Sequence, residues 1–220
     1  MKNVSLLGKK YQDFLFFFDK LTIGETNHCD NYVERLGGIY NLLDVKFEKI
    51  NFIIHTFGLK KAFIINNKEN SNRTSITVDV EPSIIKEEKI SQIENNSDWC
   101  HVAYLDDIED YEKIKLFNIP ISIDFCTNSN REKYLDIINQ CKVVFDSRER
   151  KHLYLNIDSS TPIILHDPYG LEIIQNKKII HEESMIPSSG LSVNGAGDIY
   201  AAQYIKNYFN YDIIKASTLA

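Results

Sequence analysis

The residues best suited to chemistry lie near the end of the chain, where a string of small side chains ends in a carboxylate. Residues 194–198 read Asn-Gly-Ala-Gly-Asp, and the following stretch, 199–205, is compatible with a helix. A loop of small residues that opens a helix exposes backbone N–H groups at the positive end of the helix dipole, where anions bind. Glycine lets the oxygens of an anion reach these amides, and the Asp can accept a proton from a hydroxyl group. A flexible turn with an Asp helix cap is the alternative, and residue types alone favour that interpretation.

Hydrophobic patterning predicts the elements that would position this string. Between several apolar runs lie helix-compatible stretches, such as 131–141, in which apolar residues recur at three- and four-residue spacing. Residues 41–45 show the same spacing. Alternation of buried strands with helices predicts an α/β fold with a doubly wound, mostly parallel sheet. The runs that we expect to be strands, each bounded by polar or turn residues, are 3–18, 52–54, 62–65, 100–105, 119–123, 143–145 and 163–165.

A second kind of strand is predicted around residues 74–80. Ile76, Val78 and Val80 lie on one face of this segment and polar residues on the other, which is typical of a half-exposed strand. We expect a small β lid with strands contributed by about 20–36 and 72–81, within a single domain that spans residues 1–220.

Composition excludes several function classes. The net charge is −6, the pI is near 5.5, and basic and acidic residues are interspersed, so a nucleic-acid partner is not expected. The apolar run 14–18 is far shorter than the roughly 20 residues of a membrane span, and no export leader opens the chain. We therefore expect a soluble, cytoplasmic protein without a membrane partner. The four cysteines contain no C-x-x-C pair and are typical of reduced thiols.

The string at 194–198 resembles the second signature of the PfkB carbohydrate kinases, commonly D-T-x-G-A-G-D, although Ser192 and Val193 replace its Asp-Thr. The resemblance implies a ribokinase-like fold and an ATP-dependent kinase that phosphorylates a hydroxyl of a sugar or nucleoside. It implies that Asp198 is the catalytic base. The residues that would stabilise the transferring phosphoryl group are Gly195, Ala196 and Gly197, and Asn194 is assigned to the nucleotide site.

Two earlier segments fall in the order that this family shows. Residues 37–41, Gly-Gly-Ile-Tyr-Asn, resemble its G-G-x-x-N substrate segment, with Ile39 in place of a small residue. The resemblance implies that Gly37 and Gly38 let the backbone close on the sugar and that Asn41 bonds one of its hydroxyls. Asp13, near the end of the first expected strand, matches a sugar-binding Asp, although a surface turn is an equal alternative.

Later segments resemble the nucleotide and metal motifs. Asp146 and Glu149 match the N-x-x-E motif with Asp in place of Asn, which implies that Glu149 helps to bind Mg²⁺ and Asp146 the nucleotide. A helix cap is the alternative for an acidic residue that follows a strand. Asp124 begins a looser version of the family's D-x-N-x-R stretch. Of the T-x-G-x-x-G phosphate segment only Gly170 remains, which we assign to the nucleotide site. His166 nearby is interpreted as a structural residue rather than an acid or base.

The resemblance further implies ATP and Mg²⁺ as cofactors and a homodimer formed through the lid. Only 22 residues follow Asp198, whereas the family usually has a further helix and an adenine loop, so we expect an open nucleotide pocket. The alternative function is therefore a catalytically impaired, PfkB-like sugar-binding or regulatory protein.

Overall fold

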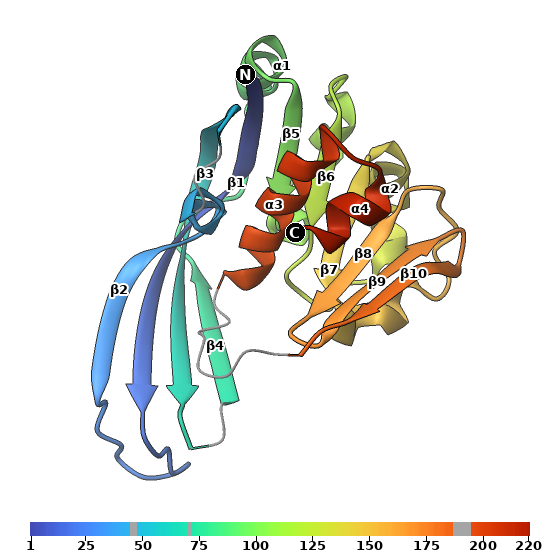
Figure 1. Cartoon of the computed structure of the whole chain (residues 1–220). Coiled ribbons are helices and arrows are strands. Elements are labelled where there is room, and N and C mark those ends of the chain that lie inside the picture. The colour runs from blue at the N-terminus through green and yellow to red at the C-terminus, as the bar shows by residue number, and fades with distance from the viewer. Residues whose placement is uncertain (45–47, 70–71, 187–194) are drawn as a thin grey trace.

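The computed structural model describes residues 1–44, 48–69, 72–186 and 195–220 (Figure 1). The strands are β1 (Lys2–Phe18), β2 (Asn31–Gly38), β3 (Ile50–Asn67), β4 (Asn72–Asp79), β5 (Trp99–Ala103), β6 (Ile121–Asp124), β7 (Val143–Ser147), β8 (Ile163–Asp167), β9 (Gly170–Gln175) and β10 (Lys178–Ser184). The α-helices are α1 (Glu87–Asn96), α2 (Leu135–Gln140), α3 (Ala196–Tyr208) and α4 (Ile213–Thr218). The 3-10 helices are η1 (Ile39–Asp44), η2 (Leu105–Asp107), η3 (Tyr111–Leu116), η4 (Arg131–Tyr134) and η5 (Arg148–Tyr154).

Within the described ranges the strands form one sheet in the order β10-β9-β8-β7-β6-β5-β1-β3-β4, with β2 also paired to β1. The central pairs, from β3 through β1, β5, β6 and β7 to β8, are parallel, and the outer pairs are antiparallel. One face buries a cluster that includes Ile93 of α1 and Ile137 of α2. The other buries Ala201 of α3 and Ala216 of α4. Helices on both faces of a mostly parallel sheet confirm the predicted doubly wound α/β fold.

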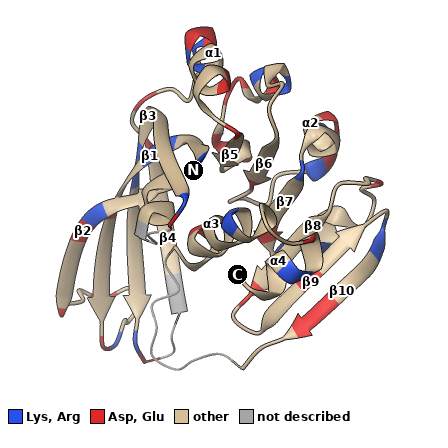
Figure 2. Ribbon diagram, turned by 45° about the horizontal axis from the view of Figure 1, so that its top comes forward, with Lys and Arg blue, Asp and Glu red and all other residues tan. Residues whose placement is uncertain are grey.

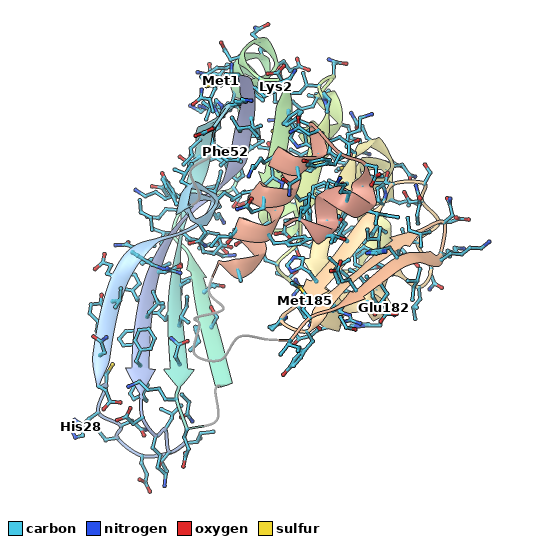
Figure 3. All side chains as sticks on the ribbon, viewed as in Figure 1. Met1, Lys2, His28, Phe52, Glu182 and Met185 are labelled. Carbon is cyan, nitrogen blue, oxygen red and sulfur yellow. The ribbon has the colours of Figure 1, made fainter. Side chains whose placement is uncertain are left out.

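The lid is the outer half of the two longest strands together with β2 and β4, and it projects away from the core (Figure 1). β1 pairs with β5 only over Val4–Gly8, and β2 takes the place of β5 beside β1 from Lys10 onward. The predicted lid segments 20–36 and 72–81 contain most of β2 and β4, whereas residues 20–30 lead to β2 through turns and bends. His28 lies in this connection at the far end of the lid (Figure 3).

Two predictions about individual elements differ from the structure in detail. The runs 52–54 and 62–65 are parts of one strand, β3, because the polar residues between them still pair with β1 through the backbone. The stretch at 41–45 forms the 3-10 helix η1 as far as Asp44, and residues 45–47 lie outside the described ranges.

Charged side chains are spread over the whole fold. Residues of both signs occur in the lid and in the core (Figure 2). Among the described residues no helix is both long and apolar enough to cross a membrane.

A bulge marks the line along which the lid joins the core. Lys9 of β1 pairs with Phe57 and Lys10 pairs with Leu59, so Gly58 is the extra residue of β3. Its φ of 58° is left-handed, and a Cβ built there would lie 2.6 Å from the Pro82 carbonyl oxygen. Extra residues of this kind increase local bend and twist, so the bulge allows β3 to serve both the core sheet and the lid.

We expect Gly58→Ala to lower the free energy of unfolding by about 2–4 kcal/mol, because it adds a clash with fixed backbone to the strain of a left-handed alanine. Gly24→Ala is the matched control, since Gly24 has φ 88° but a Cβ added to it would meet nothing within 4 Å. It should lose only about 1 kcal/mol. Urea denaturation measures both, and equal losses would show that the bulge is not tightly packed.

Candidate active site

Asp198 lies in the first turn of α3, where side chains from three distant segments meet. The residue is 4% exposed. Asn41 of η1 donates to Asp198 Oδ2 at 2.8 Å. The hydroxyl of Tyr104, which follows β5, donates to Asp198 Oδ1 and Oδ2 at 2.9 and 3.1 Å. Because β5 is a central parallel strand, the site lies at the carboxyl edge of the sheet, where open α/β sheets bind ligands.

The small residues before Asp198 allow this approach. Gly195 is the N-cap of α3 with φ 81°, and a Cβ there would lie 2.8 Å from Asn41 Cγ. Ala196 and Gly197 form the first turn, whose backbone N–H groups have no acceptor within an α-helix. The helix therefore presents amides beside a buried carboxylate. Asn194, which we assigned to the nucleotide site, lies outside the described residues.

Asp13 comes from the lid. It lies in the outer part of β1, five residues before Phe18, and is 5% exposed, so the alternative of a surface turn is wrong. Its carboxylate lies directly over Gly37: a Cβ on Gly37 would be 1.9 Å from Asp13 Oδ2. The next residue, Gly38, has φ 59° and lies against the ring of Tyr11. The structure thus brings Asp13, Gly37 and Gly38 together at the junction between β2 and η1.

Tyr11 and Tyr104 connect these lid residues to Asp198. Their rings meet edge to face with centroids 5.5 Å apart. Asp13, which shares a strand face with Tyr11, is therefore on the side of the lid that meets Tyr104 and Asp198. Of the predicted substrate-binding residues, Asn41 therefore contacts Asp198 directly. Gly38 is linked to Asp198 through Tyr11 and Tyr104, and Asp13 and Gly37 lie next to Gly38.

Sequence reasoning missed Tyr104, because it lay inside a run expected to be strand throughout. β5 ends at Ala103, and Tyr104 has φ 62°. A bulky residue with positive φ is uncommon, and such strain gathers at functional sites. Burial, followed by the charge of Asp198, raises the pKa of the Tyr104 hydroxyl well above its usual value. The group therefore stays protonated and remains a donor to Asp198.

Two further carboxylates end neighbouring strands: Asp124 is the last residue of β6, and Asp146 lies near the end of β7. Both are buried. Burial, followed by the charges of Asp198 and Asp146, raises the pKa of Asp124 well above its usual range, although the Phe125 N–H and Arg150 act in the opposite direction. A carboxylate group so placed favours its neutral form.

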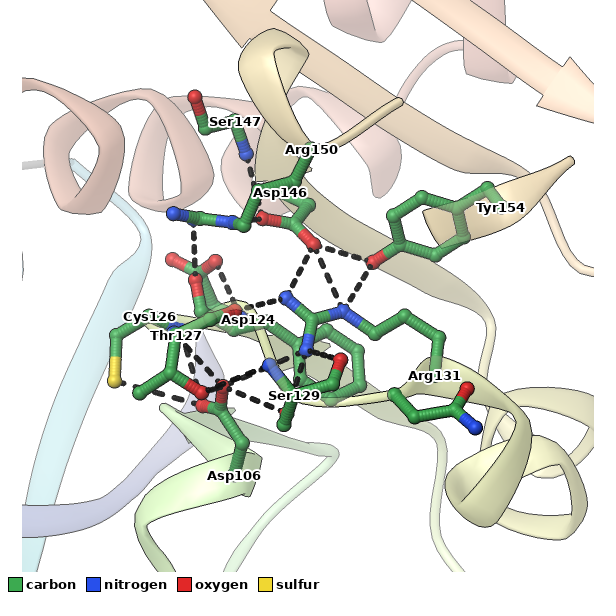
Figure 4. A network of polar contacts seen from close by, with 12 residues as sticks. Asp106, Asp124, Cys126, Thr127, Ser129, Arg131, Asp146, Ser147, Arg150 and Tyr154 are labelled. Atoms are coloured by element: carbon green, nitrogen blue, oxygen red, sulfur yellow. Dashed lines mark hydrogen bonds and ion pairs between the residues drawn. The ribbon is translucent and has the colours of Figure 1, made fainter. Parts of the chain in front are cut away.

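Asp146 is held by basic residues of the protein itself (Figure 4). Arg131 donates to Asp146 Oδ2 from Nε at 3.1 Å and from Nη2 at 2.9 Å. The Tyr154 hydroxyl donates to the same oxygen at 2.6 Å, and Arg150 Nε bonds Oδ1. Arg131 is fully buried and also lies 3.5 Å from Asp106. These contacts give Asp146 a structural role in fixing the loops after β6 and β7.

For Glu149 and Gly170, the contacts in the structure do not by themselves indicate a bound metal or nucleotide. Glu149 is exposed in η5, and its backbone N–H donates to Ser147 Oγ at 3.4 Å. Across the described part of the chain, His, Cys, Asp and Glu do not gather in a group of three or more that could hold a metal ion. Gly170 has φ 146°, and a Cβ there would lie 2.0 Å from the Glu183 carbonyl oxygen, so packing of β10 on β9 requires glycine. The structure explains this glycine without a nucleotide.

His166 is placed where it supports α3. Its Cε1 would lie 3.0 Å from a Cβ on Gly197, and its ring lies 4.9 Å from that of Tyr200 between centroids. Burial lowers the pKa of His166 to about 4, so the imidazole is neutral at pH 7. This agrees with the structural role that we expected.

Among known proteins, only solved structures match this chain. No protein-family model matches the sequence, and no curated protein matches it significantly. A microbiome-derived acarbose kinase is 14% identical, with 100% of this chain and 90% of that chain covered and a TM-score of 0.73. The Methanocaldococcus jannaschii nucleoside kinase, an archaeal member of the ribokinase family, is 16% identical (100% and 89% covered, TM-score 0.67). Arabidopsis thaliana ribokinase, solved with ribose and ATP, is 12% identical (98% and 89% covered, TM-score 0.68).

The chain has the ribokinase-like fold. The likeness spans nearly the whole of this chain and about nine tenths of each of these kinases. At such identities the likeness is one of fold, and the argument for function rests on the residues around Asp198.

We expect Asp124→Asn to be more stable than the wild type at neutral pH. The raised pKa means that folded Asp124 holds its proton to higher pH than the unfolded chain, so stability falls as pH rises above about 4. Asn keeps the oxygen that accepts from the Phe125 N–H at 2.7 Å and carries no charge. The two proteins should be equally stable near pH 3.5 to 4 and then diverge by at most about 1.4 kcal/mol per pH unit. The exposed change Asp158→Asn is the control, and parallel pH curves for Asp124→Asn and the wild type would contradict the assignment.

We expect Tyr104→Phe to lower the free energy of unfolding by about 1–3 kcal/mol, because it removes a donor from the buried Asp198 carboxylate. Tyr204 is a fully buried tyrosine whose hydroxyl has no hydrogen-bond partner among the described residues. Tyr204→Phe should therefore be neutral or stabilising. Chemical denaturation of both variants tests the pair, and similar effects of the two changes would show that Tyr104 does not support Asp198.

Proposed function

We propose that the chain is a kinase that transfers the γ-phosphoryl group of ATP to a hydroxyl of a sugar or nucleoside, with Asp198 as the catalytic base. The observation that carries the proposal is the carboxylate of Asp198, buried in the first turn of α3 and held by Asn41 and Tyr104. A positioned carboxylate beside helix N-terminal amides supplies the base and the anion site that phosphoryl transfer to an alcohol needs. The ribokinase-like fold and the kinases that share it support the same activity.

In the proposed reaction, the acceptor oxygen forms a bond to the γ-phosphorus of ATP as the bond to the β-phosphate bridging oxygen breaks. The hydroxyl proton passes to Asp198, and ADP leaves. Asn41 and Tyr104 fix the direction of the carboxylate, and Asp13 over Gly37 binds the sugar from the lid side. The amides of the N-cap residue Gly195 and of Ala196 and Gly197 in the first turn of α3 face the charge that develops on the phosphoryl group.

The protein offers few carboxylates for Mg²⁺, which is enough for the way in which kinases bind this ion. Mg²⁺ keeps several waters and takes one or two carboxylates together with substrate phosphates. Glu149 has an exposed carboxylate three residues after Asp146, so it would hold the ion, whose charge would offset that of the phosphates. Asp146 is already bonded by Arg131, Arg150 and Tyr154, so we assign it to support this region and not to the metal.

The lid offers a surface for a homodimer. Its outer face, defined by register with Phe14, exposes Tyr32, Leu36, Ile76 and Val78 by 45% to 54% of their surface. Paired lids would cover these apolar side chains and the unpaired edges of β2 and β4.

Asp198→Asn should lower kcat by about 100- to 10,000-fold and leave the Kd of the sugar near its wild-type value, because the amide cannot accept the hydroxyl proton. ADP release measures the rate and calorimetry the binding. Asp136→Asn, an exposed change on α2, is the control. Normal turnover of the Asp198 variant would show that the base is misassigned. Sugar binding by the wild type without ATP binding or ADP release would favour the impaired sugar-binding protein.

A further inference from the structure

An arginine of the lid faces the same side as the sugar-binding residues. Arg35 of β2 pairs directly with Asp13 of β1 in the antiparallel register, so both side chains project from one face of the sheet. Tyr11, on that face, contacts Tyr104, the residue that holds Asp198. Arg35 therefore lies on the lid face that looks toward the catalytic carboxylate.

The guanidinium of Arg35 has buried donors that its surroundings do not use. Nε and Nη2 are both shielded from solvent, and neither has a hydrogen-bond partner among the described residues. A buried N–H without an acceptor is costly, and native proteins rarely leave one without a reason. Two such atoms on one side chain call for an acceptor that comes from outside the chain.

The other arginines show what this pair of atoms binds. Arg131 uses Nε and Nη2 together on Asp146, at 3.1 and 2.9 Å. Arg148 uses the same two atoms on Glu172 Oε1, at 3.1 and 2.8 Å. In both cases the two nitrogens donate to one carboxylate oxygen, so this edge of a guanidinium binds an oxygen of an anionic group such as a carboxylate or phosphate. Of the arginines whose side chains are described, Arg35 is the one whose edge is left open.

The acid on the neighbouring strand does not fill the gap. Asp13 is the residue opposite Arg35, yet its carboxylate leans over Gly37, 1.9 Å from where a Cβ would stand. Gly37 lies two residues closer to the core on the same strand face, about 7 Å along β2. Asp13 is thus turned toward the core side of the lid, and Arg35 marks a second position farther out. None of the ion pairs formed between described side chains includes Arg35.

We infer that Arg35 binds an anionic group, phosphate or carboxylate, on the phosphoryl acceptor, so that the acceptor is an acidic sugar or nucleoside and not a neutral one. The inference rests on the proposed function. Asp13 would bind a hydroxyl near Gly37. The anion would accept hydrogen bonds from Nε and Nη2 of Arg35, about two residues farther along β2, or about 7 Å away. The charge would then select the acceptor and keep its reactive hydroxyl directed toward Asp198.

The test compares matched ligands on the full chain by calorimetry and by ADP release. The probes are ribose with ribose 5-phosphate, and glucose with glucose 6-phosphate and glucuronate. We expect an anionic member to bind at least about tenfold more tightly than its neutral parent, as a charge-assisted bidentate contact allows. Arg35→Gln should abolish that preference and leave binding of the neutral parent unchanged.

Lys61→Gln is the matched control. Lys61 also carries a positive charge in the lid, but on the opposite face of β3, over the ring of Phe14. It should keep the full preference for the anion. Thermal unfolding of each variant shows whether the lid remains folded, and a carboxylate preference without a phosphate preference would identify glucuronate-type acceptors.

The outcomes separate the two proposals. Neutral sugars that bind and are phosphorylated as well as their anionic partners would overturn the role of Arg35 and leave the kinase assignment standing. An anion preference that survives in Arg35→Gln would do the same. If the wild type neither binds any of these compounds nor releases ADP with them, the kinase assignment fails, and the inference fails with it.

Discussion

Burial of negative charge at one edge of the sheet governs this structure. Three carboxylates lie at the ends of β6 and β7 and at the start of α3, namely Asp124, Asp146 and Asp198. Each of them is 6% exposed or less. A carboxylate out of water is tolerable only if it is hydrogen-bonded, paired with a cation or neutralised. The main contribution differs among the three: hydrogen bonds from Asn41 and Tyr104 for Asp198, arginines for Asp146, and a raised pKa for Asp124.

These three solutions are linked. Asp146 and Asp198 both raise the pKa of Asp124, so Asp124 tends to be neutral when the other two are charged. Arg131 meanwhile joins Asp146 to Asp106, whose carboxylate accepts from the backbone N–H groups of Cys126 and Thr127. The loop after β6 is thereby fixed beside the site. A buried pair of this kind adds little net stability, and its value lies in the single arrangement that it imposes.

The sequence supports prediction of those parts that depend on local pattern. The doubly wound sheet followed from alternating apolar runs, and Asp198 from the small residues before it. Tyr104 could not be found in this way, because its importance depends on contact with a residue 94 positions away. A tyrosine at the end of an apolar run looks like one more strand residue until φ is known.

Two other residues show how a motif can be preserved or altered for reasons of packing. Gly170 remains where the family motif has glycine, yet the contact with Glu183 is enough to require it. Asp146 replaces the expected Asn, and it is the negative charge, absent from Asn, that attracts Arg131 and Arg150. Such roles are invisible in a single sequence, because the partners come from other elements.

The lid is joined to the core through β1 and β3, and these two strands run side by side across the junction. The lid has a further link to the core, because β2 ends at Gly38 and η1 begins at Ile39. Charged contacts brace this junction, since Lys60 of β3 bonds Asp107 of the core and Tyr11 of β1 donates to the same residue at 2.7 Å. Tyr11 also contacts the ring of Tyr104, whose hydroxyl donates to Asp198. A shift of the lid strands relative to the core would therefore be transmitted through two tyrosine rings to the direction of the Asp198 carboxylate.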